Sequence, residues 1–253
     1  MWDPTTYLAF AGHRERPFYD LLARVGATDP RHVVDLGCGP GTLTPVLTSR
    51  WPAAKITALD SSAEMVEAAR VAGIDAELRD VRDWRPDRDT DVVVCNAVLQ
   101  WVPDHLDLLP AWLDRLPSGA WFAFQVPGNF GEPSHTIPRG IAESPAWRDT
   151  LAGTFRPEDA VPRPEVYAGV LAAAGFTADV WETTYLHELR GADPVLNWIS
   201  GTALRPVRAA LDESGWQQFT AELAPRLRAA YPAHGQDVTW FPMRRIFAVG
   251  HKK

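Results

Sequence analysis

The sequence predicts an α/β protein built on a mostly parallel β-sheet. Three observations support this prediction: short β-branched runs alternate with amphipathic stretches, a glycine-rich turn ends the first run, and polar residues follow later ones. This alternation is typical of right-handed βαβ units, whose strands are buried on both faces. At 253 residues, the chain is long enough for one large domain of this class.

The first half of the chain contains most of the predicted sheet. Its strands are predicted at residues 32–36, 55–59, 76–79, 91–95 and 120–126. Helical periodicity fills the gaps at residues 42–50, 63–72 and 105–116. Ser61 or Ser62 is a candidate N-cap for the second of these helices.

The second half is less regular. Residues 127–164 are rich in Pro, Gly and Ser and predict a long connection over or beside the sheet. After it we expect a helix at 166–174, a strand at 176–189, a mainly helical insertion at 194–231 and a final strand at 246–250. We expect a single domain, with a core of about 25–126, 165–189 and 243–251 and a substrate cap formed by 1–24, 127–164 and 190–242.

Composition narrows the possible partners and compartment. The chain has 32 acidic and 25 basic residues, and a net charge of -7 argues against general affinity for nucleic acid or an anionic membrane. Two cysteines, Cys38 and Cys95, cannot form a disulfide framework. No apolar stretch approaches the roughly 20 residues of a spanning helix, and we expect a cytoplasmic protein. The sequence leaves the oligomeric state open.

The glycine turn separates two kinds of nucleotide cofactor. Gly37, Gly39 and Gly41 form a G-x-G-x-G pattern, whereas a dinucleotide fingerprint is G-x-G-x-x-G. Asp35 precedes this turn, where its charge would repel a pyrophosphate and attract an ammonium or sulfonium. An NAD-linked oxidoreductase is therefore the weaker interpretation.

Polar residues also stand where the next three strands end. Asp60 follows the second strand, about 20 residues after the loop, where a carboxylate can accept both ribose hydroxyls. Asp80 follows the third strand and Asn96 the fourth. Since the carboxyl ends of parallel strands meet at one edge, these residues are predicted to line one crevice.

Together these motifs resemble the Rossmann-like class I S-adenosylmethionine-dependent methyltransferases. The resemblance implies a mostly parallel seven-stranded sheet with an antiparallel last strand, plus a helical cap. It also implies S-adenosyl-L-methionine as cofactor and S-adenosyl-L-homocysteine as product. The implied cofactor-binding residues are Arg14, Asp35, Gly37, Gly39, Gly41, Asp60, Ser61, Met65, Asp80, Val81, Asn96 and Trp101.

Further segments are similar to the trans-aconitate methyltransferases within that class. They are residues 7–10, 14–17, 99–105, 181–185, 203–206 and 241–242, whereas residues 127–164 match little. This resemblance implies methyl transfer to one carboxylate of a small polycarboxylate, most simply trans-aconitate, which forms a monomethyl ester. The implied substrate-binding residues are Tyr7, Phe10, His13, Trp101, Tyr185, His187, Arg205 and Arg245.

Such a reaction needs orientation more than acid–base chemistry. A carboxylate is already ionised at pH 7, so we expect no general base and no catalytic side chain beyond those that orient the reactants. Arginine forks suit the non-reacting carboxylates, and a neutral Tyr or His donor suits the reacting one. The candidate arginines are Arg14, Arg16, Arg205, Arg244 and Arg245. Arg205 is favoured by its apolar, Pro-flanked context, and Arg14 could bind either the cofactor or the substrate.

Other functions stay open at this point. A methyltransferase of the same fold could act on an amine, a phenol or a quinone carbon, and an arginine-poor cleft would favour that alternative. A non-catalytic cofactor-binding protein could share the fold. The seven histidines lack the Cys or carboxylate spacing of a zinc site, so no metal is expected.

Overall fold

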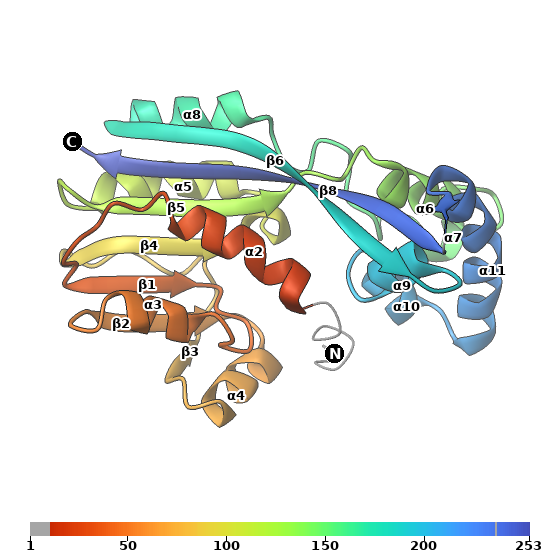
Figure 1. Ribbon diagram of the computed structural model, residues 1–253, viewed down its shortest axis with the longest axis horizontal. Helices are drawn as coiled ribbons and strands as arrows, with labels where there is room; N and C mark the ends of the chain where they lie inside the picture. Colours follow the sequence, from red (N-terminus) through yellow and green to blue (C-terminus); the bar gives the residue numbers. More distant parts are fainter. Residues whose placement is uncertain (1–10, 236) are drawn as a thin grey trace.

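The computed structural model describes residues 11–235 and 237–253, and one twisted sheet runs through them (Figure 1). Its strands follow the order β3-β2-β1-β4-β5-β8-β6, and β7 pairs with β8 as a short eighth strand. The strands are β1 (His32–Leu36), β2 (Lys55–Asp60), β3 (Ala76–Leu78), β4 (Thr90–Asn96), β5 (Trp121–Pro127), β6 (Phe176–Arg190), β7 (Ala233–His234) and β8 (Val238–Lys252). Because β8 runs antiparallel to both β5 and β6, the predicted mostly parallel sheet with an antiparallel last strand is confirmed.

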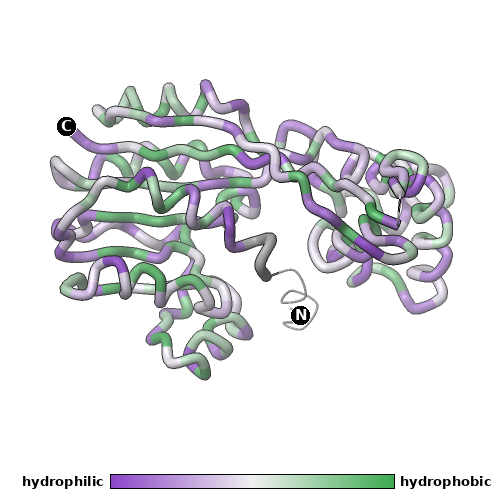
Figure 2. Tube along the Cα trace, viewed as in Figure 1, coloured by the Kyte–Doolittle hydropathy of each residue, from purple (hydrophilic) through white to green (hydrophobic). Residues whose placement is uncertain are grey.

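Helices cover both faces of this sheet. The described helices are α2 (Ala11–Leu22), α3 (Thr44–Arg50), α4 (Ala63–Val71), the 3-10 helix η1 (Leu99–Trp101), α5 (His105–Arg115), α6 (Pro133–Ala142), α7 (Arg148–Leu151), α8 (Pro164–Ala173), α9 (Pro194–Ser200), α10 (Arg205–Ala210) and α11 (Glu213–Ala230). Alternate residues of a buried strand point to opposite faces. Val33 thus packs in the core that contains Phe18 of α2, and Val34 packs in the core that contains Trp112 of α5. Hydrophobic residues run along the central strands as this burial requires (Figure 2).

A side-chain contact decides which serine caps α4. Ser62, rather than Ser61, caps α4, because its Oγ accepts a hydrogen bond from the backbone N–H of Met65 at 3.3 Å. Helix α2 packs against β5 and β8 with Phe18 and Leu21 fully buried, although residues 1–24 are predicted to belong to the cap.

The last strand is much longer than the predicted 246–250. Strands β6 and β8 pair over fifteen residues each, from Phe176 opposite Lys252 to Arg190 opposite Val238. They extend beyond the sheet into a separate group of helices that contains α6, α7, α9, α10 and α11 (Figure 1). Pro242 argues against a strand in the sequence, but it lies in the part of β8 that pairs with β6 alone, so its missing N–H is tolerated.

The connection at residues 127–164 contains helices that its turn-forming composition did not indicate. It contains α6 and α7, and Pro133 occupies the first turn of α6, where a missing N–H costs little. A proline that starts a helix and a proline that marks a loop look alike in the sequence. Within the described parts of the chain, no helix combines the length and apolar character that membrane crossing requires.

Candidate active site

The glycine loop between β1 and α3 brings backbone into a narrow space. Gly37 has φ +85°, and a Cβ atom on it would lie 2.2 Å from a methyl carbon of Val98. Gly41 has φ +77° and approaches Ile74 in the same way. Only glycine fits these two positions without strain, so the loop can present its backbone to a ligand at close range.

Asp60 ties the end of β2 to this loop. Its Oδ2 accepts a hydrogen bond from the Gly39 N–H at 2.9 Å, and its Oδ1 accepts one from the Ser62 N–H at 2.9 Å. Each carboxylate oxygen has a second lone-pair direction, so Asp60 retains acceptors for the two hydroxyls of a ribose. The carboxylate is thus held in one orientation with acceptor positions available to a ligand.

Asp35 is buried under the loop, with 3% of its surface exposed. Thr44 Oγ1 donates a hydrogen bond to its Oδ2 at 2.6 Å. Burial raises the pKa of Asp35 to about 6, although the Thr44 hydrogen bond opposes the rise. A cationic ligand placed beside it would favour its ionised form.

The remaining predicted cofactor residues border the same edge of the sheet. Asp80 forms an ion pair with Arg82 at 2.9 Å, which holds the pKa of that carboxyl below its usual range. Met65 and Val81 are buried, whereas Ser61 is exposed. Asn96 ends β4, which pairs with β1, the strand that leads into the glycine loop.

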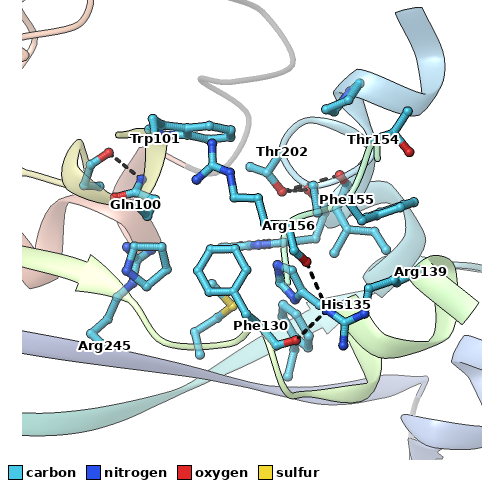
Figure 3. A pocket seen from close by; sticks show the side chains of 18 of the residues that line it. Gln100, Trp101, Phe130, His135, Arg139, Thr154, Phe155, Arg156, Thr202 and Arg245 are labelled. Carbon is cyan, nitrogen blue, oxygen red and sulfur yellow. Dashed lines mark hydrogen bonds between the residues drawn. The ribbon is translucent and has the colours of Figure 1, made fainter. Parts of the chain in front are cut away.

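A cavity of about 370 Å³ adjoins this end of β4 (Figure 3). Asn96, Gln100 and Trp101 form its wall on the sheet side. The opposite walls come from α6, from residues 153–156, from α9 and from β8. Its described lining includes three arginines, Arg139, Arg156 and Arg245, and no aspartate or glutamate. The lining therefore concentrates positive charge in a chain whose net charge is -7.

Arg156 reaches across the cavity to an aromatic side chain. Its Cζ atom lies 4.1 Å from the ring centroid of Trp101, and the two side chains lie face to face in Figure 3. Burial lowers the pKa of Arg156 to about 10, which leaves the guanidinium charged at pH 7. Its Nη1 is buried and has no hydrogen-bond partner among the described residues. This arginine is free to bind a ligand anion.

Arg139 and His135 have other surroundings. Arg139 donates hydrogen bonds to the backbone oxygens of Phe130 and Arg156, and it lies 3.7 Å from a carboxylate oxygen of Glu158. It therefore also stabilises the wall of the cavity. Burial and the nearby Arg139 lower the pKa of His135 to about 4, so this imidazole is neutral at pH 7.

Arg245 connects the cavity to the end of β4 through one glutamine. Its Nη1 donates to Gln125 Oε1 at 3.3 Å, and Gln125 Nε2 donates to Asn96 Oδ1 at 2.7 Å. Gln125 and Arg245 are buried, with 1% and 8% of their surfaces exposed.

Comparison with known proteins identifies the family. The family described as "Methyltransferase domain" matches residues 10–179. The trans-aconitate 2-methyltransferase of Mycolicibacterium gilvum (strain PYR-GCK) is 57% identical over 254 residues, which cover 100% of both chains. That of Rhodococcus jostii (strain RHA1) is 59% identical over 250 residues and 98% of both chains. The chain belongs to the trans-aconitate 2-methyltransferase family.

Solved structures support the fold of this methyltransferase. The YcgJ protein of Bacillus subtilis aligns with a TM-score of 0.59 and 12% identity, over 94% of this chain and 99% of that one. A phosphoethanolamine N-methyltransferase 2 of Haemonchus contortus, in complex with S-adenosyl-L-methionine, aligns with a TM-score of 0.54 and 14% identity. That alignment covers 94% of this chain and 53% of the other. At these identities the likeness concerns the fold alone.

Only some of the predicted substrate residues lie at the cavity. Trp101 and Arg245 line it, whereas Tyr185, His187 and Arg205 are not among its described lining residues. Tyr185 is buried and donates a hydrogen bond to Asp20 at 2.6 Å, and His187 stacks behind the cavity on Trp198, with 4.9 Å between ring centroids.

Arg205 begins α10 and is half-buried, next to residues that line the cavity. It interacts electrostatically with Glu64 of α4. Arg205 is therefore close enough to feel the charge of Glu64 on α4, and it is not among the described residues that line the cavity.

The remaining residues that the sequence suggests for the substrate site are not among the described residues that line the cavity. Arg16 and Arg244 form ion pairs with Asp20 and Glu182. Tyr7 and Phe10 lie outside the described residues. His13 and Arg14 fall within α2, but their side chains are also outside the description.

The arginines and the histidine from residues 127–164 are missed by the sequence analysis. One local signal was available: Arg156 precedes Pro157 next to an aromatic residue, much as Arg205 precedes Pro206 in an apolar setting. Gln100 is missed as well. Its Nε2 donates to the Ala97 carbonyl oxygen, while its buried Oε1 has no partner among the described residues.

A potential metal-binding group, which the sequence does not predict, lies at the opposite end of the sheet. His32, Asp87 and Asp89 offer ligand atoms within 4.8 Å of one another. His32 Nδ1 lies 3.4 Å from a carboxylate oxygen of Asp89. The group is at the start of β1, away from the cavity.

Proposed function

We propose that this chain transfers a methyl group from S-adenosyl-L-methionine to a carboxylate of trans-aconitate or a closely related small polycarboxylate. The products are the monomethyl ester and S-adenosyl-L-homocysteine. The observation that carries the proposal is the cavity beside the end of β4, lined by three arginines and, among described residues, by no acid. The names of relatives at 57% and 59% identity support the same acceptor.

In this proposal the cofactor binds at the carboxyl ends of the parallel strands. When bound, the sulfonium cofactor supplies an electrophilic methyl group. Asp60 binds the ribose hydroxyls, and the glycine loop lets the backbone approach the nucleoside. Asp35 provides negative charge below the loop for the cationic end of the cofactor. Asp80 borders the adenine.

In this proposal the arginines of the cavity bind the polycarboxylate substrate. Arg156 and Arg245 hold the carboxylates that do not react, because guanidinium groups bind carboxylates through two hydrogen bonds. Phe130, Phe155 and Phe241 surround them with apolar surface that excludes water. The reacting carboxylate is then held in line with the methyl group.

The reaction proceeds without a general base. The reacting carboxylate has a pKa near 4 and is ionised at pH 7, so no proton must be removed from the nucleophile. His135 is neutral at this pH and can donate a hydrogen bond without reducing nucleophilicity as strongly as a cation would. Methylation of an amine or phenol would favour a base or a cation-binding pocket, and three arginines disfavour the latter.

A panel of acceptors tests the proposal. Release of S-adenosyl-L-homocysteine is measured with trans-aconitate, tricarballylate, citrate, a monocarboxylate, a primary amine and a phenol. We expect trans-aconitate to give the highest kcat/KM and the monocarboxylate to be poor. Turnover of the amine or phenol with no turnover of any acid would overturn the proposal.

We also propose that the chain works in the cytoplasm as a single domain. The free thiols of Cys38 and Cys95 fit a reducing compartment. In this proposal, residues 127–164 and 190–242 form the substrate cap on the sheet core, and the partner is the small polycarboxylate rather than a nucleic acid or a membrane.

A further inference from the structure

Three side chains form a hydrogen-bonded chain on one face of the sheet. Asn96 and Gln125 are direct neighbours in the pairing of β4 with β5, and Arg245 of β8 pairs with Pro127, two residues beyond Gln125. Residues two apart in a strand share a face, so the three side chains can meet in a row. Asn96 and Arg245 both line the substrate cavity, and Gln125 is buried between them.

The chemistry of these groups dictates how both amides are turned. A guanidinium has only N–H donors, so the atom of Gln125 that faces Arg245 must be the oxygen. The Gln125 amide nitrogen is thereby directed at Asn96, where it requires an acceptor, which is Oδ1. The Nδ2 donor of Asn96 takes no part in this chain of hydrogen bonds. No described residue accepts a hydrogen bond from it.

The backbone at the end of β4 is held by the same glutamine. The residue after Asn96, Ala97, has φ +57°, a conformation that residues other than glycine seldom adopt. Its N–H donates to the Gln125 carbonyl oxygen at 2.9 Å, and its own carbonyl oxygen accepts from Gln100. Backbone held in such a conformation is typical of functional sites. Gln125 thus fixes both the side chain of Asn96 and the backbone after it.

We infer that Gln125 is a positioning residue, which takes its orientation from Arg245 and aims the Asn96 Nδ2–H donor at the reacting carboxylate. This inference rests on the proposed function. Asn96 lines the arginine-containing cavity and ends β4, which is paired with the strand that leads into the glycine loop, so the two substrates would meet near it. A neutral amide donor holds one carboxylate oxygen while leaving the other nucleophilic, which a guanidinium would do less well.

A double-mutant cycle tests whether Gln125 acts through Asn96. In Gln125→Glu, both carboxylate oxygens are acceptors, so Asn96 must turn its own oxygen toward the substrate and repel it. We expect kcat with trans-aconitate to fall about 30-fold in Gln125→Glu and by a similar factor in Asn96→Ala. Because the glutamine acts through Asn96, adding Gln125→Glu to Asn96→Ala should change kcat by less than about threefold.

Two control variants separate an effect that Gln125 exerts through Asn96 from an effect of the added negative charge. Gln218→Glu makes the same chemical change on the exposed face of α11 and should leave kcat unchanged. Gln125→Met removes the polar contacts without adding charge. It should lower kcat while the Kd of S-adenosyl-L-homocysteine changes less than about twofold, and this loss too should vanish in the Asn96→Ala background.

Two outcomes would overturn the inference or its premise. If Gln125→Glu lowers kcat by the same factor with and without Asn96→Ala, the glutamine acts through Arg245 or through folding. The inference that it positions Asn96 would then be wrong. Absence of turnover of every carboxylic acid by the parent protein would instead reject the proposed function itself.

Discussion

The guanidinium of Arg156 lies over the indole ring of Trp101, with 4.1 Å between Cζ and the ring centroid. Arg156 belongs to the connection after β5, and Trp101 ends η1, directly after β4. The contact therefore spans the cavity between the helical part and the sheet (Figure 3). It keeps a charged group against an aromatic ring, and no carboxylate among the described residues pairs with it.

Replacement of Arg156 should affect the substrate and spare the cofactor. Arg156→Gln should lower kcat/KM for trans-aconitate about 100-fold, because a desolvated substrate carboxylate loses its partner. Arg156→Lys should recover only part of this loss, since an ammonium lacks the planar fork. Arg163→Gln, at an exposed arginine of the same connection, is the matched control. An unchanged kcat/KM in Arg156→Gln would remove this arginine from the substrate site.

Arg205 should behave differently from Arg156. Since it interacts with Glu64 on the cofactor side, Arg205→Ala should weaken binding of S-adenosyl-L-homocysteine and lower activity together, each by about tenfold. Calorimetry and initial rates measure the two effects. A loss confined to trans-aconitate, with unchanged cofactor affinity, would instead support the substrate clamp that the sequence predicts at Arg205.

Asp60→Ala should weaken cofactor binding about 30-fold to 150-fold. The substitution removes two hydrogen bonds to the ribose and two that orient the Gly39 and Ser62 backbone. Isothermal titration with S-adenosyl-L-homocysteine checks this value. Unchanged affinity would mean that the ribose binds elsewhere.

Asp35 should make cofactor affinity dependent on pH. Burial raises its pKa from 3.8 to about 6, and a bound cation favours the carboxylate, so cofactor binding releases a proton below that value. Affinity for S-adenosyl-L-methionine should therefore rise from pH 5 to pH 7 and then level off. Asp35→Asn should flatten this dependence and weaken binding of the sulfonium cofactor more than that of its thioether product. Equal losses for both would indicate a hydrogen-bonding role alone.

Turnover itself should be nearly independent of pH between about 6.5 and 8.5. The acceptor carboxylate is fully ionised there, and His135 stays neutral because its pKa is lowered to about 4. Single-turnover rates avoid masking by product release. A steep rise in rate across this range would point to an acceptor that must lose a proton.

The sequence by itself determined the mostly parallel sheet and the polar residues at the ends of its strands. The alternation of strands and helices, the glycine turn and the placement of Asp35, Asp60 and Asn96 at strand ends depend on short-range spacing, which is visible in one dimension. The antiparallel last strand was implied by the family resemblance. The positive φ angles of Gly37 and Gly41 belong to the same local pattern.

Only the tertiary structure decided which cap residues meet the substrate cavity. Arg156 and Arg205 each precede a proline, yet of these two only Arg156 lines the described cavity. The two arginines differ because the connection after β5 and the helices after β6 pack differently on the extended pair of β6 and β8. Local sequence periodicity does not reveal this packing. The Arg245–Gln125–Asn96 chain is likewise invisible in sequence, because its members are joined by strand register across 29 and 120 positions.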